Sequence, residues 1–529
     1  MKDTLKLRKS FASAIAIACA GAVPTMAVSG QVDLVAPDGS LRLAGEFVEF
    51  VDGHFVIDTA IGQMRVSASR VTCKGEACPS ADTSDVSLRI TGSDSIGAEL
   101  MPLLLSGYAS QSGGEVKFQP LPNSPDKLAD LGGAQGLREE AGQVLLASAK
   151  PAEAFEALAR NEAEISMSSR RVLPDEARAL AALGAGNMNS DEQEHLLALE
   201  SIAIVTHPDN PVSEIGMDQL REVFLGNISN WKELNGPDMP IEPIGRSGMT
   251  PSREIFETVL FDDTGVTFAD VKTVTSDVAA ASYVTENKGA ISFLPFGVQR
   301  DTSPLNIIDS CGAMTVPNEF YTKTEEYPFV RRVYLYSRGD MENELAQGLL
   351  DFATSREAED AISVAGFTSL NISRLPQHMP GLRKSYAQTV ENKAYEKGII
   401  DGMLETASKH DRLSSTFHFR SGSSRLDERS ISELARLIEF LTEQPSGTKV
   451  KLVGFSDDIG TYDSNRRLSQ RRAERLLNRL KAEAVGQLAH IEISTTGYGE
   501  IAPAACNSTG EGRLKNRRVE IWIESSVQG

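Results

Sequence analysis

The chain contains 529 residues, a length typical of three or four domains rather than one. Apolar residues make up 41% and charged residues 24%, as in folded globular proteins. The formal net charge of −20 argues against general nucleic-acid binding, although a few local arginines can still bind an anionic ligand.

Residues 1–27 have the pattern of a secretory signal peptide. A basic start, from Lys2 to Lys9, precedes the apolar stretch Phe11–Ala20, which is too short to span a bilayer. Ala27 closes an acceptable cleavage site. Lipidation at Cys19 is the alternative that we disfavour. No later stretch has the length and apolar character of a membrane helix, so we expect an exported protein.

Export permits disulfide bonds. Cys73 and Cys78 flank four residues and are candidates for a local bridge. Cys311 and Cys506 fall in different predicted domains, and the sequence leaves open whether they pair. No Cys/His cluster has metal-ligand spacing, so we predict neither a metal nor a cofactor.

Residues 28–80 are predicted to form a small β-rich module. Apolar and polar residues alternate through residues 31–73, and Asp52-Gly53 is a turn signal within them. The role of this module is not legible from the sequence.

Strand and helix patterns alternate through residues 86–378, which predicts α/β architecture. Three polar turns lie between a strand and a helix, at residues 91–97, 168–171 and 245–253. Such turns present hydroxyls and free backbone N–H groups, and with Arg170 and Arg246 they could converge on one oxyanion. The alternative interpretation, three unrelated helix caps, remains open.

Residues 86–378 resemble the phosphate-type solute-binding proteins of ABC importers. The resemblance rests on the segment 201–238, which contains Ile228-Ser229-Asn230-Trp231, and on Lys288–Phe293. It implies two α/β lobes with a ligand cleft between them. The oxyanion-binding residues that it implies are Ser93, Ser95, Glu164, Ser168, Arg246, Thr250 and Ser252.

The ligand loop departs from the family pattern. Arg246 and Phe256 keep its frame, but the usual Ser-Gly-Thr is Thr250-Pro251-Ser252, and proline has no backbone donor. Glu164 occupies a position that the family usually gives to Asp. The expected ligand is phosphate or a related oxyanion, and a different ligand is the alternative.

Residues 379–410 are predicted to be a helical linker, weakened by Gly398 and Gly402. The last segment, 411–529, interleaves strands with two helices and is predicted to be a small α/β sandwich. In it Asp457 follows a strand, and Arg472 lies fifteen residues later in an Arg-rich helix. Together they could hold the ammonium and carboxylate of a zwitterion; an ordinary solvated helix is the alternative.

This segment resembles the OmpA-like peptidoglycan-binding domain. The match runs from Gly454–Gly460 through Leu468–Ala473 to Asn516–Glu520. The resemblance implies that Asp457 and Arg472 bind the diaminopimelate of the stem peptide, and that Asn465, Asn516 and Arg517 shape the pocket. Phe455 and Ser456 replace the family's usual His and Thr.

The predicted fold is therefore α/β and multidomain, with an N-terminal β module, a two-lobed binding-protein fold and a C-terminal OmpA-like sandwich. We expect a non-enzymatic periplasmic solute-binding protein held on peptidoglycan, with an ABC permease or an outer-membrane protein as a further partner and no nucleic acid. The alternative is a structural or signalling protein of the cell wall that recognises a protein or wall fragment. No Ser-His-Asp arrangement or metal cluster supports an enzyme.

Overall fold

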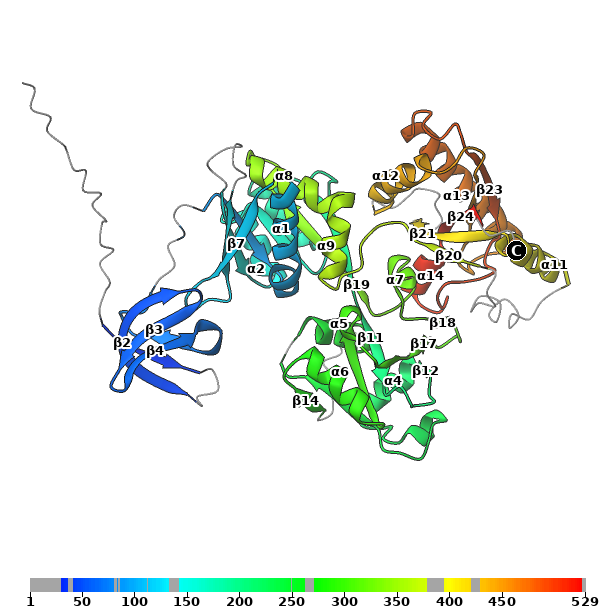
Figure 1. Ribbon diagram of the computed structural model, residues 1–529. Coiled ribbons are helices and arrows are strands. Elements are labelled where there is room, and N and C mark those ends of the chain that lie inside the picture. The colour runs from blue at the N-terminus through cyan, green and yellow to red at the C-terminus, as the bar shows by residue number, and fades with distance from the viewer. Residues whose placement is uncertain are drawn as a thin grey trace, which may run out of the picture. The chain divides into compact units, whose positions relative to one another are not determined.

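A computed structural model describes residues 30–36, 41–79, 83, 86–111, 113–132, 142–248, 250–261, 271–377, 394–419 and 429–525. The predicted signal peptide at 1–27 lies outside these residues. The chain divides into two compact units, of which the first comprises residues 1–82 and 119–125 and the second the rest (Figure 1). No helix in the described ranges has the length and apolar character needed to cross a membrane.

The first unit contains one antiparallel sheet. Its elements are β1 (Gln31–Val35), β2 (Arg42–Val51), β3 (His54–Thr59), β4 (Gly62–Ser67), η1 (Ala68–Arg70) and β5 (Thr72–Lys74). The strand order is β4-β3-β2-β1-β5. Cys73 and Cys78 form a disulfide, and the Cys73 backbone exchanges two hydrogen bonds with the Asn123 side chain. The predicted β module and its local bridge are therefore present.

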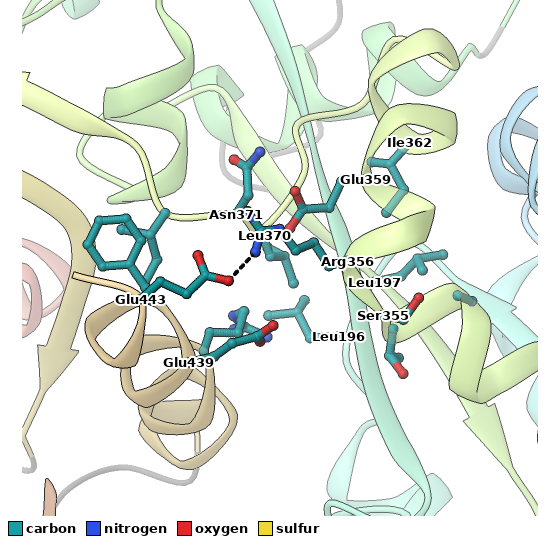
Figure 2. Close-up of a pocket in the computed structure, with 15 residues that line it drawn as sticks. Leu196, Leu197, Ser355, Arg356, Glu359, Ile362, Leu370, Asn371, Glu439 and Glu443 are labelled. Atoms are coloured by element: carbon teal, nitrogen blue, oxygen red, sulfur yellow. Dashed lines mark hydrogen bonds and ion pairs between the residues drawn. The ribbon is translucent and has the colours of Figure 1, made fainter. Parts of the chain in front are cut away.

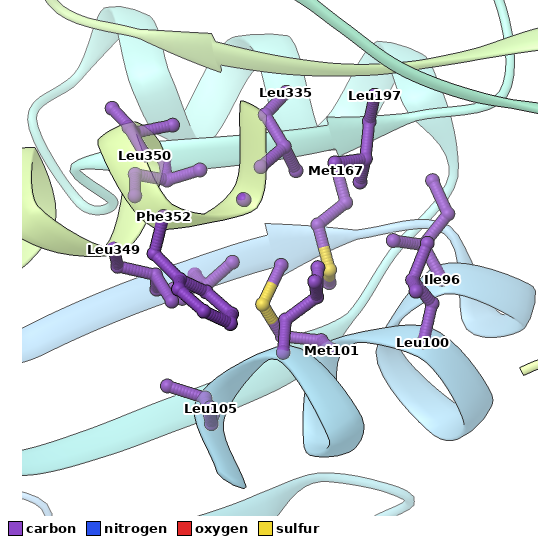
Figure 3. Close-up of a cluster of buried hydrophobic side chains, with 14 of the residues drawn as sticks. Ile96, Leu100, Met101, Leu105, Met167, Leu197, Leu335, Leu349, Leu350 and Phe352 are labelled. Atoms are coloured by element: carbon purple, nitrogen blue, oxygen red, sulfur yellow. The ribbon is translucent and has the colours of Figure 1, made fainter. Parts of the chain in front are cut away.

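The second unit begins with a lobe that we call lobe 1. Its strands are β6 (Leu88–Gly92), β7 (Glu115–Pro120), β8 (Lys127–Gly132), β9 (Gln143–Ser148) and β10 (Ile165–Ser168). Its helices are η2 (Ile96–Leu100), α1 (Met101–Gln111), α2 (Pro151–Ala159), α3 (Pro174–Ala182), α8 (Glu344–Thr354), η5 (Arg356–Ala358) and α9 (Glu359–Val364). Figure 3 shows its buried core, where Met101, Met167 and Phe352 meet from a helix, a strand and a second helix.

The following lobe, lobe 2, has its own core. Its strands are β12 (Glu214–Gly216), β13 (Glu242–Arg246), β14 (Lys272–Val274), β15 (Ala290–Pro295), β16 (Ser303–Pro304), β17 (Asn306–Ile308) and β18 (Met314–Thr315). Its helices are α4 (Met217–Phe224), η3 (Trp231–Leu234), α5 (Pro251–Phe261), α6 (Asp277–Glu286), η4 (Phe296–Val298) and α7 (Glu319–Lys323). Trp231 is fully buried and donates to the Gly289 carbonyl at 3.0 Å, so this residue of the recognised motif is structural.

Two long strands connect the lobes: β11 (Glu194–Thr206) and β19 (Val330–Ser337). The first half of β11 pairs with β19, and its second half pairs with β15 of lobe 2. One sheet therefore runs through both lobes, in the order β14-β13-β15-β11-β19-β10-β6-β9-β8-β7. This arrangement confirms the predicted two-lobed α/β architecture.

The C-terminal domain is a sheet covered by helices on both faces. Its strands are β20 (Arg374–Pro376), β21 (His410–His418), β22 (Lys449–Gly454), β23 (Glu492–Gly497) and β24 (Arg518–Glu524), in the order β20-β21-β24-β22-β23. Its helices are α11 (Ala394–Ala407), α12 (Arg429–Thr442), α13 (Tyr462–Glu483) and α14 (Gly510–Asn516). Leucines of α12 and α13 share one buried cluster with alternate residues of the strands.

The interpretation of residues 379–410 as a linker is wrong in part. Ile400 and Met403 of α11 are buried against Phe455 and Trp522 on the other face of this sheet. The helix is thus a layer of the C-terminal domain. In addition, β20 is its edge strand, so the domain begins before residue 378. Residues 378–393 lie outside the described residues.

Candidate functional site

The predicted diaminopimelate site lies where α13 crosses the ends of β22 and β23. A Cβ atom at Gly454 would come within 2.1 Å of the Ser469 carbonyl oxygen, and one at Gly497 within 2.3 Å of the Gln470 nitrogen. Only glycine permits this approach of helix to sheet. The contact places Arg472, on the sheet side of α13, beside the loop that follows β22.

Asp457 forms its direct ion pair with Arg517. The Arg517 Nη1 donates to Asp457 Oδ2 at 2.9 Å, and each side chain is 10% exposed. The Arg517 Nε also donates to the Phe419 carbonyl at 3.2 Å. Arg517 therefore orients the carboxylate, a stronger role than the pocket-shaping one expected from the sequence.

Arg472 supplies a second, fully buried guanidinium. Its Nη1 donates to the Phe455 carbonyl at 3.4 Å, and its Cζ lies 5.5 Å from the centroid of the Phe419 ring. Burial lowers the pKa of Arg472 to about 10; nearby Asp457 opposes this shift and Arg517 adds to it. The side chain stays cationic at neutral pH, and an incoming carboxylate would compensate its lost hydration.

The two predicted asparagines have different roles. Asn465 is buried and donates to Glu500, a residue that the sequence analysis left without a role. Asn516 uses its whole amide on the segment 504–507: its Oδ1 accepts from the Ala504 and Ala505 amides, and its Nδ2 donates to the Ala505 carbonyl and to Asn507. These bonds make Asn516 a brace for that segment, and the expectation that it shapes the ligand pocket stays a prediction.

In lobe 1, the structure brings Ser93 and Ser95 together after β6. Their hydroxyl oxygens are 3.3 Å apart, and both residues are buried. The turn that follows, Ile96–Leu100, is π-helical, a geometry often found at functional sites. It carries Glu99, an acidic residue that no sequence motif identifies as part of a site.

Ser168 and Glu164 lie at opposite ends of β10. The Ser168 hydroxyl donates to the Arg170 carbonyl at 2.6 Å, within its own turn. Glu164 precedes the strand and accepts from the Arg89 amide at 2.7 Å. Four residues of strand separate the two positions by about 13 Å. Glu164 is therefore not an oxyanion residue, and the prediction that it is one is wrong.

Arg170 also does not join the predicted convergence of polar turns. Its guanidinium forms two hydrogen bonds with Glu176, at 2.8 and 2.6 Å. A bidentate partner of this kind satisfies the planar fork of arginine.

In lobe 2, Arg246 ends β13 and pairs with Asp277 at the start of α6. The Nη1–Oδ2 distance is 3.2 Å, and the side chains are 40% and 20% exposed. The Thr250 hydroxyl accepts from the Arg253 amide at 3.3 Å and so caps α5. Ser252 is buried in the first turn of that helix, after Pro251.

Electrostatics connect Glu99 of lobe 1 with lobe 2. Partial desolvation raises the pKa of Glu99, although its side chain is still exposed; the charges of Glu200 and Asp277 raise it further, and those of Arg246 and Lys127 lower it. Glu200 itself pairs with Arg331 of β19 at 2.8 Å, where β11 and β19 pass between the lobes. Arg246 therefore lies in a region whose other charged groups are mainly carboxylates, namely those of Glu99, Glu200 and Asp277.

One group of potential metal ligands occurs within the described ranges. Atoms of Asp309, Cys311 and Cys506 lie within 4.8 Å of one another, but the two sulfurs form a disulfide. A disulfide sulfur is not the thiolate that metals prefer, so this group does not fit a metal ion.

Two parts of the chain are similar to known protein families. Residues 141–357 match the PBP superfamily domain, and residues 418–517 match the OmpA family. The chain is 28% identical over 173 residues to the phosphate-binding protein PstS of Bacillus subtilis, covering 32% of this chain and 54% of that protein. It is 39% identical over 99 residues to outer membrane porin F of Pseudomonas fluorescens, covering 19% of this chain and 29% of that protein.

The chain thus spans less than two thirds of the length of each of these relatives. Among solved structures, it is similar to an ABC-type phosphate transport receptor from Vibrio cholerae, with 21% identity and a TM-score of 0.40. That alignment covers 53% of this chain and 98% of the other.

Proposed function

Because the chain carries a PBP superfamily domain and a C-terminal OmpA family domain, we propose that it is a non-enzymatic binding protein of the cell envelope, held on peptidoglycan. Both domain types are binding or structural rather than catalytic. The observation that carries the proposal is the buried group of Asp457, Arg472 and Arg517, which offers a carboxylate to an ammonium and a guanidinium to a carboxylate.

The ligand proposed for this group is the zwitterionic end of diaminopimelate in a stem peptide. Asp457→Asn keeps the size of the side chain and removes its charge, and Asp458→Asn is a matched control because the adjacent Asp458 is exposed. We expect Asp457→Asn to lose retention on purified peptidoglycan and Asp458→Asn to keep it. Equal retention of both folded variants would exclude the proposed site.

For the two lobes we propose phosphate or a related oxyanion as the ligand. Arg246, the paired hydroxyls of Ser93 and Ser95, and the similarity to a protein named for phosphate binding support this ligand. Calorimetry with phosphate, sulfate and phosphonates provides the test. Absence of heat with every one of these anions, in folded protein, would exclude the oxyanion.

A second candidate is a structural or signalling protein whose lobes recognise a protein or wall fragment. It is favoured by polar groups that already have partners: Asp277 neutralises Arg246, and the Thr250 hydroxyl caps α5. Binding of a muropeptide by the full-length Asp457→Asn variant, in which the C-terminal site is disabled, without binding of any oxyanion, would favour this function.

We place the protein in the periplasm, on the cell wall and beside the outer membrane. An ABC permease is the partner if the lobes deliver a ligand, and an outer-membrane protein is the partner if they serve a structural role. Cross-linking of the exported protein in cells would distinguish these two partners.

A further inference from the structure

A disulfide joins lobe 2 to the C-terminal domain. Cys311 lies between β17 and β18, and Cys506 lies between β23 and α14, 195 residues later. The Cys506 segment is the one that Asn516 braces through four hydrogen bonds. The covalent bond is therefore anchored in ordered structure on the C-terminal side.

A buried ion pair forms a second attachment between these two parts. Arg412 of β21 is 1% exposed, and its Nη2 donates to Glu326 Oε1 of lobe 2 at 2.5 Å. Its Nε lies 3.3 Å from Glu520 Oε2 on β24, and its Cζ lies 5.5 Å from the Phe320 ring centroid in α7. Separating lobe 2 from the sheet would leave these buried charges without their partners, which is strongly unfavourable.

The contact of the C-terminal domain with lobe 1 is of another kind. Arg356 of η5 pairs with Glu443, just after α12, at 2.6 Å, but the side chains are 62% and 52% exposed. Beside this pair lies a pocket of about 240 Å³ between the two parts, which Figure 2 shows with Leu197 and Ile362 on one side and Glu439 on the other. Exposed ion pairs are screened by salt and contribute little, so this contact can open.

We propose that lobe 2 and the C-terminal domain form one rigid body, and that lobe 1 is the moving part, held at α12 by a releasable latch. The latch consists of Arg356 and Glu443. Rotation of lobe 1 about the strands β11 and β19 opens or closes the latch and leaves the disulfide and the Arg412 contact unchanged. Strengthening the latch therefore biases the position of lobe 1. This inference does not depend on which ligand the lobes bind.

Distances between spin labels test the proposal without any ligand. Exposed positions for labels are Ala152 on α2 of lobe 1, Glu286 at the end of α6 of lobe 2, and Arg475 on α13. Ala152→Cys with Arg475→Cys reports on lobe 1, and Glu286→Cys with Arg475→Cys reports on lobe 2. Because the native cysteines of the described chain are in disulfides, the introduced thiols take the labels.

We expect a narrow distance distribution for the lobe 2 pair and a broader one for the lobe 1 pair. Glu443→Lys places two cations together, so it should broaden the lobe 1 distribution further and leave the lobe 2 distribution unchanged. Combining it with Arg356→Glu restores an ion pair of opposite polarity and should restore the original width.

Three results would overturn the proposal. They are a lobe 2 distribution as broad as that of lobe 1, a lobe 1 distribution that Glu443→Lys does not change, and a charge swap that fails to restore it. All of these substitutions are at exposed positions, so we expect the fold to be kept.

Discussion

Two regions of this protein place an arginine beside an aspartate, and they do so in opposite ways. In the C-terminal domain, Asp457 and Arg517 are each 10% exposed and lie beside the fully buried Arg472. Between the lobes, Arg246 and Asp277 are 40% and 20% exposed, within a surround that includes Glu99.

The difference lies in what each carboxylate does. Asp457 belongs to a group with two guanidinium ions and one carboxylate, so the group retains a net positive charge, which would attract the carboxylate of the proposed ligand. Asp277 competes with an anion for the single guanidinium of Arg246. We therefore expect loss of the acid to weaken binding in the C-terminal domain and to strengthen it between the lobes.

The largest expected effect is on Arg472. Arg472→Met should weaken retention on peptidoglycan about 10- to 100-fold, because hydrogen bonds to charged groups contribute about 1.5–3 kcal/mol each. The free energy of unfolding of this variant should stay the same or increase, since burial disfavours the charged form of Arg472. Binding and urea unfolding measure the two effects. Arg471→Met, at an exposed position of the same helix, is the control; an equal loss there would contradict the site.

The next largest effect concerns Asp277, whose loss should have the opposite effect on binding to the loss of Asp457. Asp277→Asn should tighten oxyanion binding by about three- to tenfold, because an exposed ion pair of about 1 kcal/mol no longer competes with the ligand. Arg246→Gln should weaken binding at least about tenfold. Calorimetry with phosphate measures both. Weaker binding by Asp277→Asn would mean that the carboxylate serves the ligand, as Asp457 is proposed to do.

A smaller effect concerns Glu99. Its pKa is raised, so acidification protonates it above the usual range of a glutamate and removes a negative charge near Arg246. Oxyanion binding should therefore tighten as the pH falls through this raised pKa. Glu99→Gln should bind more tightly at neutral pH and lose the advantage in acid. The affinity of Glu99→Gln for phosphate is divided by that of the wild-type protein at each pH, so that the titration of phosphate itself cancels. A ratio that does not change with pH would contradict the prediction.

The smallest effect is on stability. His195 in β11 is half-buried beside Ser337, and burial lowers its pKa below the ordinary value of 6.5. The unfolded chain then binds more protons, so the free energy of unfolding falls as the pH drops below about 6.5, down to the folded pKa. Urea unfolding should show this loss of stability, and His195→Asn should remove it. A loss of equal size in the variant would assign it to other groups.

The sequence predicts the arrangement of side chains around Asp457 better than the arrangement between the lobes, for a physical reason. Where α13 packs on the sheet, the close approach of its backbone requires glycine at positions 454 and 497, and Asp457 and Arg472 stand at fixed distances in the sequence from Gly454. The spacing of these residues can therefore be recognised in the sequence. Asn516 belongs to the same pattern, but its role depends on bonds to the backbone of another segment, which no motif reveals.

Between the lobes, the sequence does not fix positions along short elements. The sequence pattern puts Glu164 in the turn with Ser168, but that turn begins only after β10, so Glu164 lies at the opposite end of a four-residue strand. Glu99 depends on the charges of Glu200 and Asp277, which lie far from it in the sequence, and the partner of Arg170, Glu176, comes from the first turn of the next helix. The helix α11 is predicted to be part of a linker, weakened by two glycines, and its buried face is visible only in its packing on the sheet.

The two disulfides join neighbours in the order of the chain, Cys73 with Cys78 and Cys311 with Cys506. If the predicted signal peptide, which contains Cys19, is removed on export, a chain that enters an oxidising compartment N-terminus first meets its remaining four cysteines in the order in which they pair. The first bridge closes after 5 residues, whereas Cys311 has to wait as a free thiol for 195 more. Stepwise oxidation of these four cysteines in order would therefore yield the native pairing without disulfide isomerisation. The last bond can form only after the C-terminal domain, which contains Cys506, has entered the compartment.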